Sequence, residues 1–389
     1  MPRFRAEAPW AWRLLRRYAL ALPCGRRVET PGRRPTIADA AGEAPALLCV
    51  ADPESYLLPE AAHRLVEGLR EERWDVILPV SNEPWVEEAR SAPPYAYPTP
   101  SLLEEAVRFM ATAPRELCPA RAPQSPVFAA RRDVLRALPQ DLALDSVPQE
   151  AHRRGHRVAI DPGAYLHRYG EMDGQAREDL AQKVPSRTES VLDVGCSRGA
   201  TAKALRASGV RRIVGIEPDA EDAKAAALVY DRVLPIPLEA VREEFPGEFD
   251  AVLFGDVLEH LVDPSAALTR VRPWLSPTGV VIASVPNLGH WSVVTDLLHG
   301  RFDYVPYSIL SGTHLRFFTR RTVSNLFASC GYRLDTVDTV VLPASPSGAK
   351  DLARLARLPE ASADLAVAEF LVVARPEDSA ESGVKIRHE

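Results

Sequence analysis

The chain has 389 residues, of which 46% are hydrophobic and 26% are charged, and its formal net charge at pH 7 is -6. Such a length predicts two domains, or one domain with substantial additions, and the composition is typical of a soluble globular protein. The acidic balance argues against general nucleic-acid binding, which needs a basic face. Because no apolar run of about 18 residues occurs, we predict no membrane span.

The five cysteines are scattered and form no C-x-x-C pair; they are Cys24, Cys49, Cys118, Cys196 and Cys330. This usage predicts neither a disulfide framework nor a structural zinc site. It fits a reducing compartment, so we expect a cytoplasmic protein without a bound metal.

The first 150 residues predict a separate, smaller α/β domain. Residues 10–18 are basic and rich in tryptophan, which indicates a helix packed on its own protein or, as the alternative, a helix on a membrane surface. Residues 46–50 and 75–80 read as buried strands, and residues 60–72 between them have helical spacing. This order predicts a parallel βαβ unit. Residues 140–165 are polar and basic, which indicates a linker.

An acidic pair, Asp52 and Glu54, follows the first of these strands. With it, residues 45–140 faintly resemble the central part of a GT-A glycosyltransferase, where such a pair holds a divalent metal and a nucleotide sugar. Glu54 departs from the usual second aspartate, and few residues precede the pair. We therefore interpret the region as a degenerate remnant or an interaction module, and keep an active transferase as the alternative.

The most informative stretch is residues 191–199, VLDVGCSRG, which indicates a buried strand that breaks into a glycine turn. Residues 213–217 read as a second strand that ends in Glu217. This acid stands roughly 20 residues past the turn, the offset at which a carboxylate can bind a ribose diol. The pair of segments predicts a nucleoside site.

The glycine spacing indicates which nucleoside. It is Gly195-x-x-x-Gly199, with Ser197 at the position of a middle glycine and Asp193 just before the turn. A carboxylate at that place would repel a pyrophosphate at short range. It suits a ligand with positive charge and no phosphate, and S-adenosylmethionine, with its sulfonium and ammonium groups, is such a ligand.

Residues from about 160 to 376 resemble a class I S-adenosylmethionine-dependent methyltransferase. The segments that carry the resemblance are Asp193–Gly199, Gly215–Pro218, Asp256–Leu261 and His314–Thr319. The last two are similar to those of a bacterial subgroup linked to small-molecule and saccharide O-methylation. The resemblance implies an α/β fold with a Rossmann-like, doubly wound, mostly parallel sheet that ends in an antiparallel hairpin.

The predicted elements of this region alternate as that fold requires. We expect strands near 191–195, 212–217, 232–236, 249–255, 279–285, 332–342 and 366–374. We expect helices near 178–183, 199–207, 219–229, 264–274 and 322–330. A loop-rich insert should follow the fifth strand, residues 343–358 should form a Pro/Ser-rich excursion, and residues 377–389 a disordered tail.

The resemblance implies the cofactor-binding residues. These are Asp193, Gly195, Cys196, Ser197 and Gly199 in the turn, Glu217 and Pro218 at the ribose, and Asp256 and Val257 after the fourth strand. The aspartate that often contacts adenine after the third strand is missing, since residues 235–239 read PIPLE, so a backbone group is expected there. For Asp256 the alternative is a cap of the following turn.

Methyl transfer to a hydroxyl benefits from a base that takes the proton. His314 is the first candidate because an imidazole titrates near neutral pH, and the alternative is that it holds the insert in place by hydrogen bonds. His260 and Asp256 are the other candidate catalytic residues. The expected acceptor surface, for which core packing is the alternative, consists of Asn287, His290, Trp291, Tyr304, Tyr307 and Arg316.

The sequence therefore predicts a methyltransferase that moves a methyl group from S-adenosylmethionine to an oxygen of a small-molecule or saccharide acceptor. Three alternatives stay open at this point: a non-catalytic scaffold that keeps the cofactor pocket, a nicotinamide-dependent oxidoreductase, and a bifunctional glycosyltransferase–methyltransferase. The absence of a G-x-G-x-x-G turn speaks against the oxidoreductase.

Overall fold

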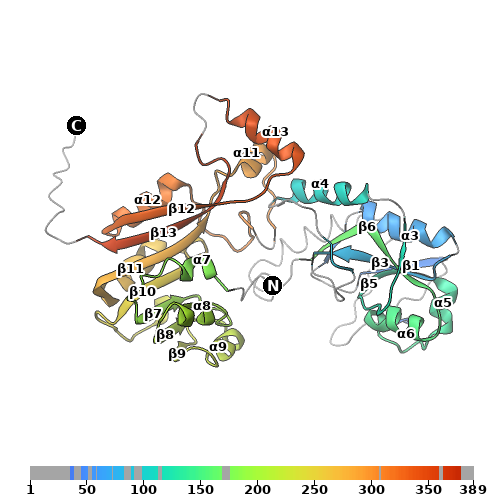
Figure 1. The fold of residues 1–389 in the computed structure, drawn as a ribbon, viewed down its shortest axis with the longest axis horizontal. Helices are drawn as coiled ribbons and strands as arrows, with labels where there is room; N and C mark the ends of the chain where they lie inside the picture. Colours follow the sequence, from blue (N-terminus) through green and yellow to red (C-terminus); the bar gives the residue numbers. More distant parts are fainter. Residues whose placement is uncertain are drawn as a thin grey trace. The chain divides into compact units, whose positions relative to one another are not determined.

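The computed structural model forms two compact units, Met1–Gly170 with Asp303–Pro306, and Glu171–Phe302 with Tyr307–Glu389 (Figure 1). It describes residues 36–38, 45–50, 55–57, 59–71, 73–82, 89–91, 99–112, 116–168, 176–305, 308–358 and 362–377. Several sequence predictions lie outside these residues: the basic segment 10–18, the acidic pair Asp52 and Glu54, Tyr307 of the predicted acceptor surface, and all but the first residue of the tail 377–389.

The first unit is an α/β layer structure. Its strands are β1 (Ala46–Val50), β2 (Ser55–Tyr56), β3 (Val76–Ser81), β4 (Cys118–Pro119), β5 (Val127–Arg131) and β6 (Val158–Arg168). Its helices are α3 (Pro59–Gly68), α4 (Pro100–Ala111), α5 (Arg132–Ala137) and α6 (Val147–Arg153). The strand order is β1-β5-β3-β6-β2, with β4 paired to β6.

The two strands of the predicted βαβ unit run parallel, as predicted, but the prediction that they are neighbours in the sheet is wrong. Both β1 and β3 pair antiparallel with β5, so they run the same way, with α3 between them in the chain. They are not neighbours, because β5 lies between them. The inserted strand comes about 50 residues after β3 in the chain, and local spacing contains no information about it.

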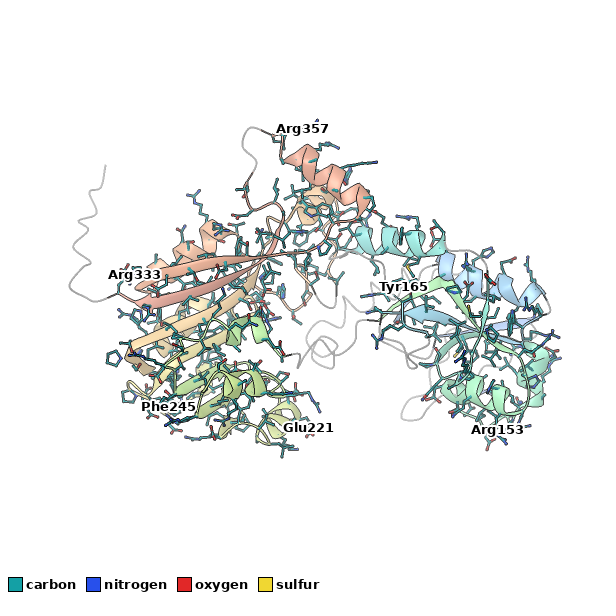
Figure 2. The ribbon with its side chains drawn as sticks, viewed as in Figure 1. Arg153, Tyr165, Glu221, Phe245, Arg333 and Arg357 are labelled. Carbon is teal, nitrogen blue, oxygen red and sulfur yellow. The ribbon has the colours of Figure 1, made fainter. Side chains whose placement is uncertain are left out.

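The prediction of a linker over 140–165 is wrong. Helix α6 and strand β6 fall there, and β6 pairs parallel with β3 and antiparallel with β2 and β4. Among the basic residues of this range, Arg153 ends α6 and Arg154 follows it, and Glu150 accepts hydrogen bonds from both. The apolar residues of β6 are buried, among them Tyr165, which is labelled in Figure 2.

The second unit is a larger sheet with helices. Its strands are β7 (Ser190–Val194), β8 (Arg212–Ile216), β9 (Arg232–Leu234), β10 (Phe249–Gly255), β11 (Leu275–Pro286), β12 (Tyr332–Val341) and β13 (Val367–Pro376). Its helices are α7 (Glu178–Ala181), α8 (Ala202–Ala207), α9 (Ala220–Ala226), α10 (Pro264–Val271), α11 (Trp291–Leu298), α12 (Arg320–Ser329) and α13 (Pro346–Leu355). These bounds agree with the predicted strands and with the predicted helices up to α12.

The sheet has the order β12-β13-β11-β10-β7-β8-β9. Strands β7 to β11 pair in parallel, and β13 runs antiparallel to both β11 and β12. The prediction of a doubly wound, mostly parallel sheet with a C-terminal antiparallel hairpin is therefore confirmed. The chain reverses its direction of winding between β7 and β10, and in such sheets ligands bind outside the carboxyl ends of the strands at this point.

Two hydrophobic cores hold the sheet, one on each face, because successive side chains of a strand point to opposite sides. In β7, Leu192 and Val194 belong to the core that contains Trp274, whereas Val191 belongs to the core that contains Tyr230. In the first core Phe245, labelled in Figure 2, meets Trp274 edge-on at 5.2 Å between ring centroids. Burial on both faces explains why the parallel strands are continuous apolar runs.

The segment 343–358 is more regular than predicted, because it contains α13. Ser345 caps this helix by accepting a hydrogen bond of 3.0 Å from the Gly348 amide. Trp291 covers Gly348 so closely that a Cβ at this glycine would lie 2.3 Å from the ring. The predicted loop-rich insert after β11 also contains a helix, α11.

Among the described helices, none has the length and apolar character needed to cross a membrane.

Candidate functional site

The glycine turn after β7 is strained and closely packed. Gly195 and Gly199 have φ of 72° and 81°, and Ser197 between them has φ of 45°. A Cβ added to Gly195 would lie 2.6 Å from Cγ2 of Val257, the residue that follows the end of β10 by two. Only glycine fits at this position, because a side chain would meet both the backbone strain and the neighbouring loop.

Asp193, the fourth residue of β7, is buried at the base of this turn. Its Oδ2 accepts a hydrogen bond of 2.6 Å from the Tyr230 hydroxyl. Burial raises the pKa of Asp193 to about 6, and the charge of Glu217 adds to the effect, while the bond from Tyr230 opposes it. A buried carboxylate of this kind favours a nearby cation.

Glu217 follows β8 and is fully buried beside the same turn. Its Oε2 accepts a hydrogen bond of 2.9 Å from the Ser197 amide, and its Oε1 accepts one of 2.8 Å from the Asp219 amide. A carboxylate oxygen has two acceptor sites, so these bonds orient Glu217 without exhausting its capacity for ligand hydroxyls. The side chain therefore lies against the glycine turn, and its predicted contact with a ribose stays a prediction.

Other residues of the predicted cofactor set differ in exposure. Cys196 is buried, and burial raises the pKa of its thiol. The Ser197 hydroxyl is buried with no hydrogen-bond partner, which is costly unless a ligand supplies one. Pro218 is exposed, and Val257 is half-buried against Gly195. The unpartnered Ser197 hydroxyl and the two glycines of the turn fit a small polar ligand at this edge of the sheet.

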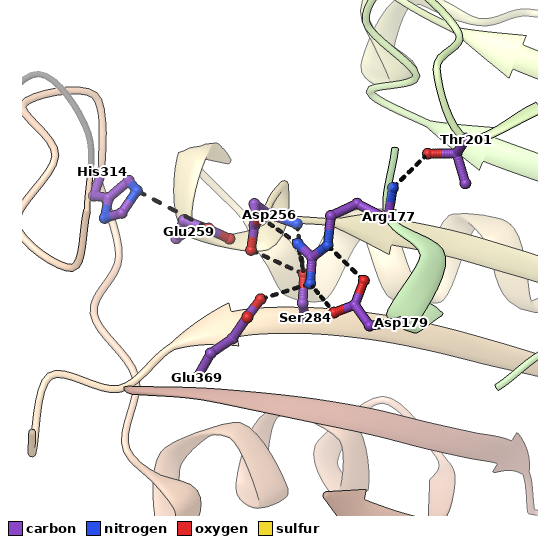
Figure 3. A network of polar contacts seen from close by, with 8 residues as sticks. All are labelled: Arg177, Asp179, Thr201, Asp256, Glu259, Ser284, His314 and Glu369. Carbon is purple, nitrogen blue, oxygen red and sulfur yellow. Dashed lines mark hydrogen bonds and ion pairs between the residues drawn. The ribbon is translucent and has the colours of Figure 1, made fainter. Parts of the chain in front are cut away.

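Asp256 follows β10 in a left-handed conformation, with φ of 53°. Its amide donates to the Ser284 hydroxyl at 2.9 Å, and this hydroxyl lies 2.9 Å from the Asp256 carboxylate, to which it donates. Arg177 also donates to Asp256 (Figure 3). These contacts hold the carboxylate at the switch point, half-exposed, where the sequence predicts a cofactor or acceptor contact.

Arg177 gathers three carboxylates in front of the sheet (Figure 3). Besides Asp256, it donates to Asp179 at 2.7 Å and to Glu369 of β13 at 2.8 Å. Burial and the charge of Asp256 raise the pKa of Glu369, against the effect of Arg177. Sequence reasoning missed this network. The available signal was Glu369 itself, an acid between apolar residues near the start of β13.

Glu259 and His314 lie near Asp256 (Figure 3), and together with His260 they form a second polar cluster. The two imidazole rings meet at 4.8 Å between centroids, and Nε2 of His314 lies 4.0 Å from Oε1 of Glu259. In all, ligand atoms of the three residues lie within 4.8 Å of one another, so the cluster could hold a metal ion. The sequence predicted no metal.

The environment of His314 differs from the prediction. Burial lowers its pKa to about 4, so the expectation that it titrates near neutral pH is wrong. Its Nδ1 is 3.0 Å from the Ile309 carbonyl, to which it donates, so the alternative of a hydrogen bond that holds the insert is present in the structure. Burial also raises the pKa of Glu259 well above its usual value.

Three residues of the predicted acceptor surface are core residues. Asn287 donates to the carbonyls of Asp364 and Val367 at 3.0 and 2.7 Å, His290 caps α11, and Trp291 packs on Gly348. All three are nearly fully buried, with 1%, 1% and 3% exposed. Arg316 is exposed, Tyr304 is grouped with the first unit, and Tyr307 lies outside the described residues.

Comparison with known proteins agrees with this geometry. A family model described as "Methyltransferase domain" matches residues 165–337. Over these residues the chain is therefore similar to methyltransferase domains. The buried carboxylates of Asp193 and Glu217 beside the glycine turn suit a ligand with positive charge.

Curated relatives of the methyltransferase domain are enzymes named "Ubiquinone biosynthesis O-methyltransferase". The protein of Psychrobacter arcticus is 30% identical over 154 residues, which are 37% of this chain and 59% of that protein. That of Bradyrhizobium diazoefficiens is 32% identical over 128 residues, 32% of this chain and 49% of that protein. The chain thus spans about half the length of these relatives.

Solved structures similar to the chain are methyltransferases as well. One is an S-adenosylmethionine-dependent methyltransferase from Archaeoglobus fulgidus, with TM-score 0.39 and 15% identity over 53% of this chain and 97% of that one. Another, from Thermotoga maritima, is titled a possible histamine N-methyltransferase, with TM-score 0.38 and 17% identity over 51% and 87%.

Proposed function

We propose that the chain transfers a methyl group from S-adenosylmethionine to an oxygen of a small-molecule or saccharide acceptor. The observation that carries the proposal is the pair of buried carboxylates, Asp193 and Glu217, on either side of a strained glycine turn at the switch point. Bound S-adenosylmethionine supplies an electrophilic methyl group on a positively charged sulfur. Every other part of the reaction is binding, orientation and proton transfer by the chain.

Each carboxylate has a distinct role in this proposal. Glu217 receives the ribose hydroxyls, because the amides of Ser197 and Asp219 hold its oxygens in place. Asp193 orients the turn and favours the ammonium group, with Tyr230 as its fixed donor. Gly195 and Gly199 allow the backbone to approach the ligand closely.

In this proposal the acceptor binds at the carboxyl ends of β10 and β11. Asp256 is held there by Arg177 and Ser284, and we assign it to the region where the sulfonium and the attacking oxygen would meet. His260 and His314 lie on the next polar cluster. A neutral imidazole can accept the proton of a hydroxyl or bind a metal ion. The names of the relatives support oxygen as the methylated atom.

Titration calorimetry of the full chain with S-adenosylmethionine tests the cofactor site. We expect saturable binding with one ligand per chain, and at least a tenfold loss of affinity in Glu217→Ala. Glu221→Ala is the matched control, because Glu221 is an exposed acid of α9 that pairs with Lys224. No binding by the intact chain, or equal binding by Glu217→Ala, would contradict the proposal.

Turnover on a panel of acceptors then separates an enzyme from a scaffold that only binds the cofactor. In a strain that lacks the protein, one metabolite or glycan should be lighter by the mass of one methyl group.

We further propose that this activity belongs to the second unit, and that the first unit is a separate α/β domain. Metal-dependent hydrolysis of nucleotide sugars by the full chain would support the glycosyltransferase alternative for the first unit.

A further inference from the structure

We propose that Glu259, His260 and His314 bind a divalent transition-metal ion, of which Zn²⁺ is the best match, beside the acceptor position of the methyltransferase domain. The proposal concerns residues that the cofactor site does not use. Because metal binding is measured without S-adenosylmethionine, it stands or fails independently of the proposed methyl transfer.

The first observation is the state of Glu259. Its side chain is 1% exposed, and both carboxylate oxygens are buried without a hydrogen-bond partner. A buried carboxyl group that makes no hydrogen bond costs several kcal/mol of desolvation, so structures rarely keep one without a ligand. The residue stands in η6 (Leu258–His260), a short turn directly after Asp256 in the switch region. A ligand of the two Glu259 oxygens would offset this desolvation cost.

The second observation is the distance between the groups. Nε2 of His314 and Oε1 of Glu259 are 4.0 Å apart, too far for a hydrogen bond. Two ligands of one tetrahedral zinc, each about 2.0–2.2 Å from the metal, stand roughly 3.4 Å apart. The gap is thus near the size that a shared ion requires, and a small side-chain movement closes it. Figure 3 shows the His314 ring directed at Glu259 from a separate segment of the chain.

The third observation is the set of contacts behind the imidazoles. Nδ1 of His314 donates to the Ile309 carbonyl at 3.0 Å, and Nδ1 of His260 stands 3.2 Å from the Thr313 carbonyl. Metal-bound histidines usually donate the other ring nitrogen to such a group, which sets the tautomer with the lone pair on Nε2. For His314 this nitrogen is the one next to Glu259.

Backbone contacts join the two segments that carry the ligands. The Glu259 carbonyl accepts hydrogen bonds from the amides of Leu315 and Arg316, at 2.8 and 2.9 Å. Residue 314 is therefore held against η6 by its immediate neighbours, although more than fifty positions separate it from Glu259 in the chain. The site is preorganised by the backbone, which is the arrangement expected of a metal site rather than of an accidental cluster.

The ligand set indicates both the metal and its use. Two imidazoles and one carboxylate are a known zinc combination, which leaves a fourth position for an exogenous ligand. An oxygen-bearing acceptor could occupy that position, and a metal-bound hydroxyl loses its proton more easily than a free one. The acceptor class that fits is therefore a compound whose hydroxyl, or a neighbouring oxygen, can coordinate a divalent cation.

The experiment is metal binding by the full chain. The protein is stripped with a chelator, dialysed, and titrated with Zn²⁺ in the presence of a chromophoric competitor, and bound zinc is counted by elemental analysis. We expect one zinc per chain, and at least a hundredfold loss of affinity in Glu259→Gln and in His314→Ala. His299→Ala is the matched control, because His299 is an exposed histidine at the end of α11.

Two further readouts keep the result clear. Co²⁺ in place of Zn²⁺ should give visible absorption bands of a tetrahedral site that Glu259→Gln abolishes, while the unfolding temperature of metal-free Glu259→Gln shows that the variant folds. Calorimetry with S-adenosylmethionine should show binding with and without zinc, so a failed metal site is distinguishable from a failed cofactor site. Binding of less than one zinc per chain, or an equal loss of zinc in His299→Ala, would overturn the proposal.

Discussion

The hydroxyl of Tyr230 donates a hydrogen bond of 2.6 Å to Oδ2 of Asp193, and both groups are buried. The bond joins the segment after α9 to the strand that precedes the glycine turn. It is the contact that allows a carboxylate to persist at the base of the turn. The charged form of Asp193 depends on it, because the bond lowers the pKa that burial raises.

Tyr230→Phe should therefore destabilise the protein by about 1.5–3 kcal/mol at pH 8, the range for a hydrogen bond to a charged group. The loss should shrink at pH 5, where Asp193 is protonated in the folded state. Urea unfolding at both pH values measures it. Tyr332→Phe is the control: Tyr332 donates to the neutral Leu268 carbonyl at 2.9 Å, so its cost should be about 1 kcal/mol at either pH. If the loss of stability depended equally on pH in both variants, the conclusion that Tyr230 donates to an ionised Asp193 would be contradicted.

Asp193 should make stability and cofactor affinity respond to pH in opposite directions. Its folded pKa of about 6 exceeds the ordinary value of 3.8, so its contribution to stability is full below about pH 4 and is lost as pH rises through about 6. The loss amounts to roughly 3 kcal/mol. S-adenosylmethionine, whose ammonium group favours the ionised carboxylate, should bind up to ~100-fold more tightly across the same window.

Asp193→Asn isolates this effect, because the other carboxylates titrate in both proteins. The difference in unfolding free energy between the wild type and Asp193→Asn should change between pH 4 and pH 6 and be constant above about pH 7. The affinity of the variant for S-adenosylmethionine should be weaker and nearly independent of pH in that range. A difference curve that is flat from pH 4 to pH 8 would refute a perturbed Asp193.

Gly195→Ala should cost more than its backbone conformation alone explains. Both Gly195 and Gly209 have positive φ, of 72° and 95°. A Cβ at Gly209 meets nothing within 4 Å, so Gly209→Ala should cost about 1–2 kcal/mol and leave cofactor binding unchanged. At Gly195 the Cβ meets Val257 at 2.6 Å, so we expect a larger loss and at least tenfold weaker binding of S-adenosylmethionine. Thermal unfolding and calorimetry compare the two variants, and equal losses would show that close packing is unimportant.

Arg177→Met should leave Asp256 and Glu369 facing each other without their shared cation. We expect a loss of about 2–3 kcal/mol at pH 8, less than for a fully buried pair because Asp256 is half-exposed. The loss should be smaller at pH 6, since Glu369, whose pKa is already raised, takes up a proton there. Arg232→Met is the control: its partner Glu243 is exposed, so its loss of stability should be much smaller than that of Arg177→Met. Urea unfolding that ranks the two variants equally would contradict this account of the network.

Local patterns explain what was predictable. Val191, Leu192 and Val194 are apolar because a central parallel strand is buried on both faces, and such apolar runs indicate strands. Gly195 and Gly199 indicate a turn with positive φ, a backbone conformation that favours glycine. Asp193 and Glu217 are acids at strand ends, and parallel strands bring their carboxyl ends to one edge, so their proximity followed from order alone.

Residues whose role depends on a distant partner were not predictable in that way. Strand β5 separates β1 from β3, and nothing near either strand indicates it. The acids around Arg177 come from three separate segments of the chain. An arginine before β7 does not by itself indicate which acids it will contact. The pKa of His314 was predicted wrongly because burial, not residue type, decides it.

By itself the sequence determined the succession of strands and helices in the second unit, the glycine turn and the acids that flank it, since these depend on side-chain periodicity and on residues adjacent in the chain. Only the tertiary structure decided which polar groups are deprived of water and of partners. The contact of His314 with Glu259 is of this kind: desolvation is a property of the folded neighbourhood, and it turns two ordinary side chains into a candidate metal site.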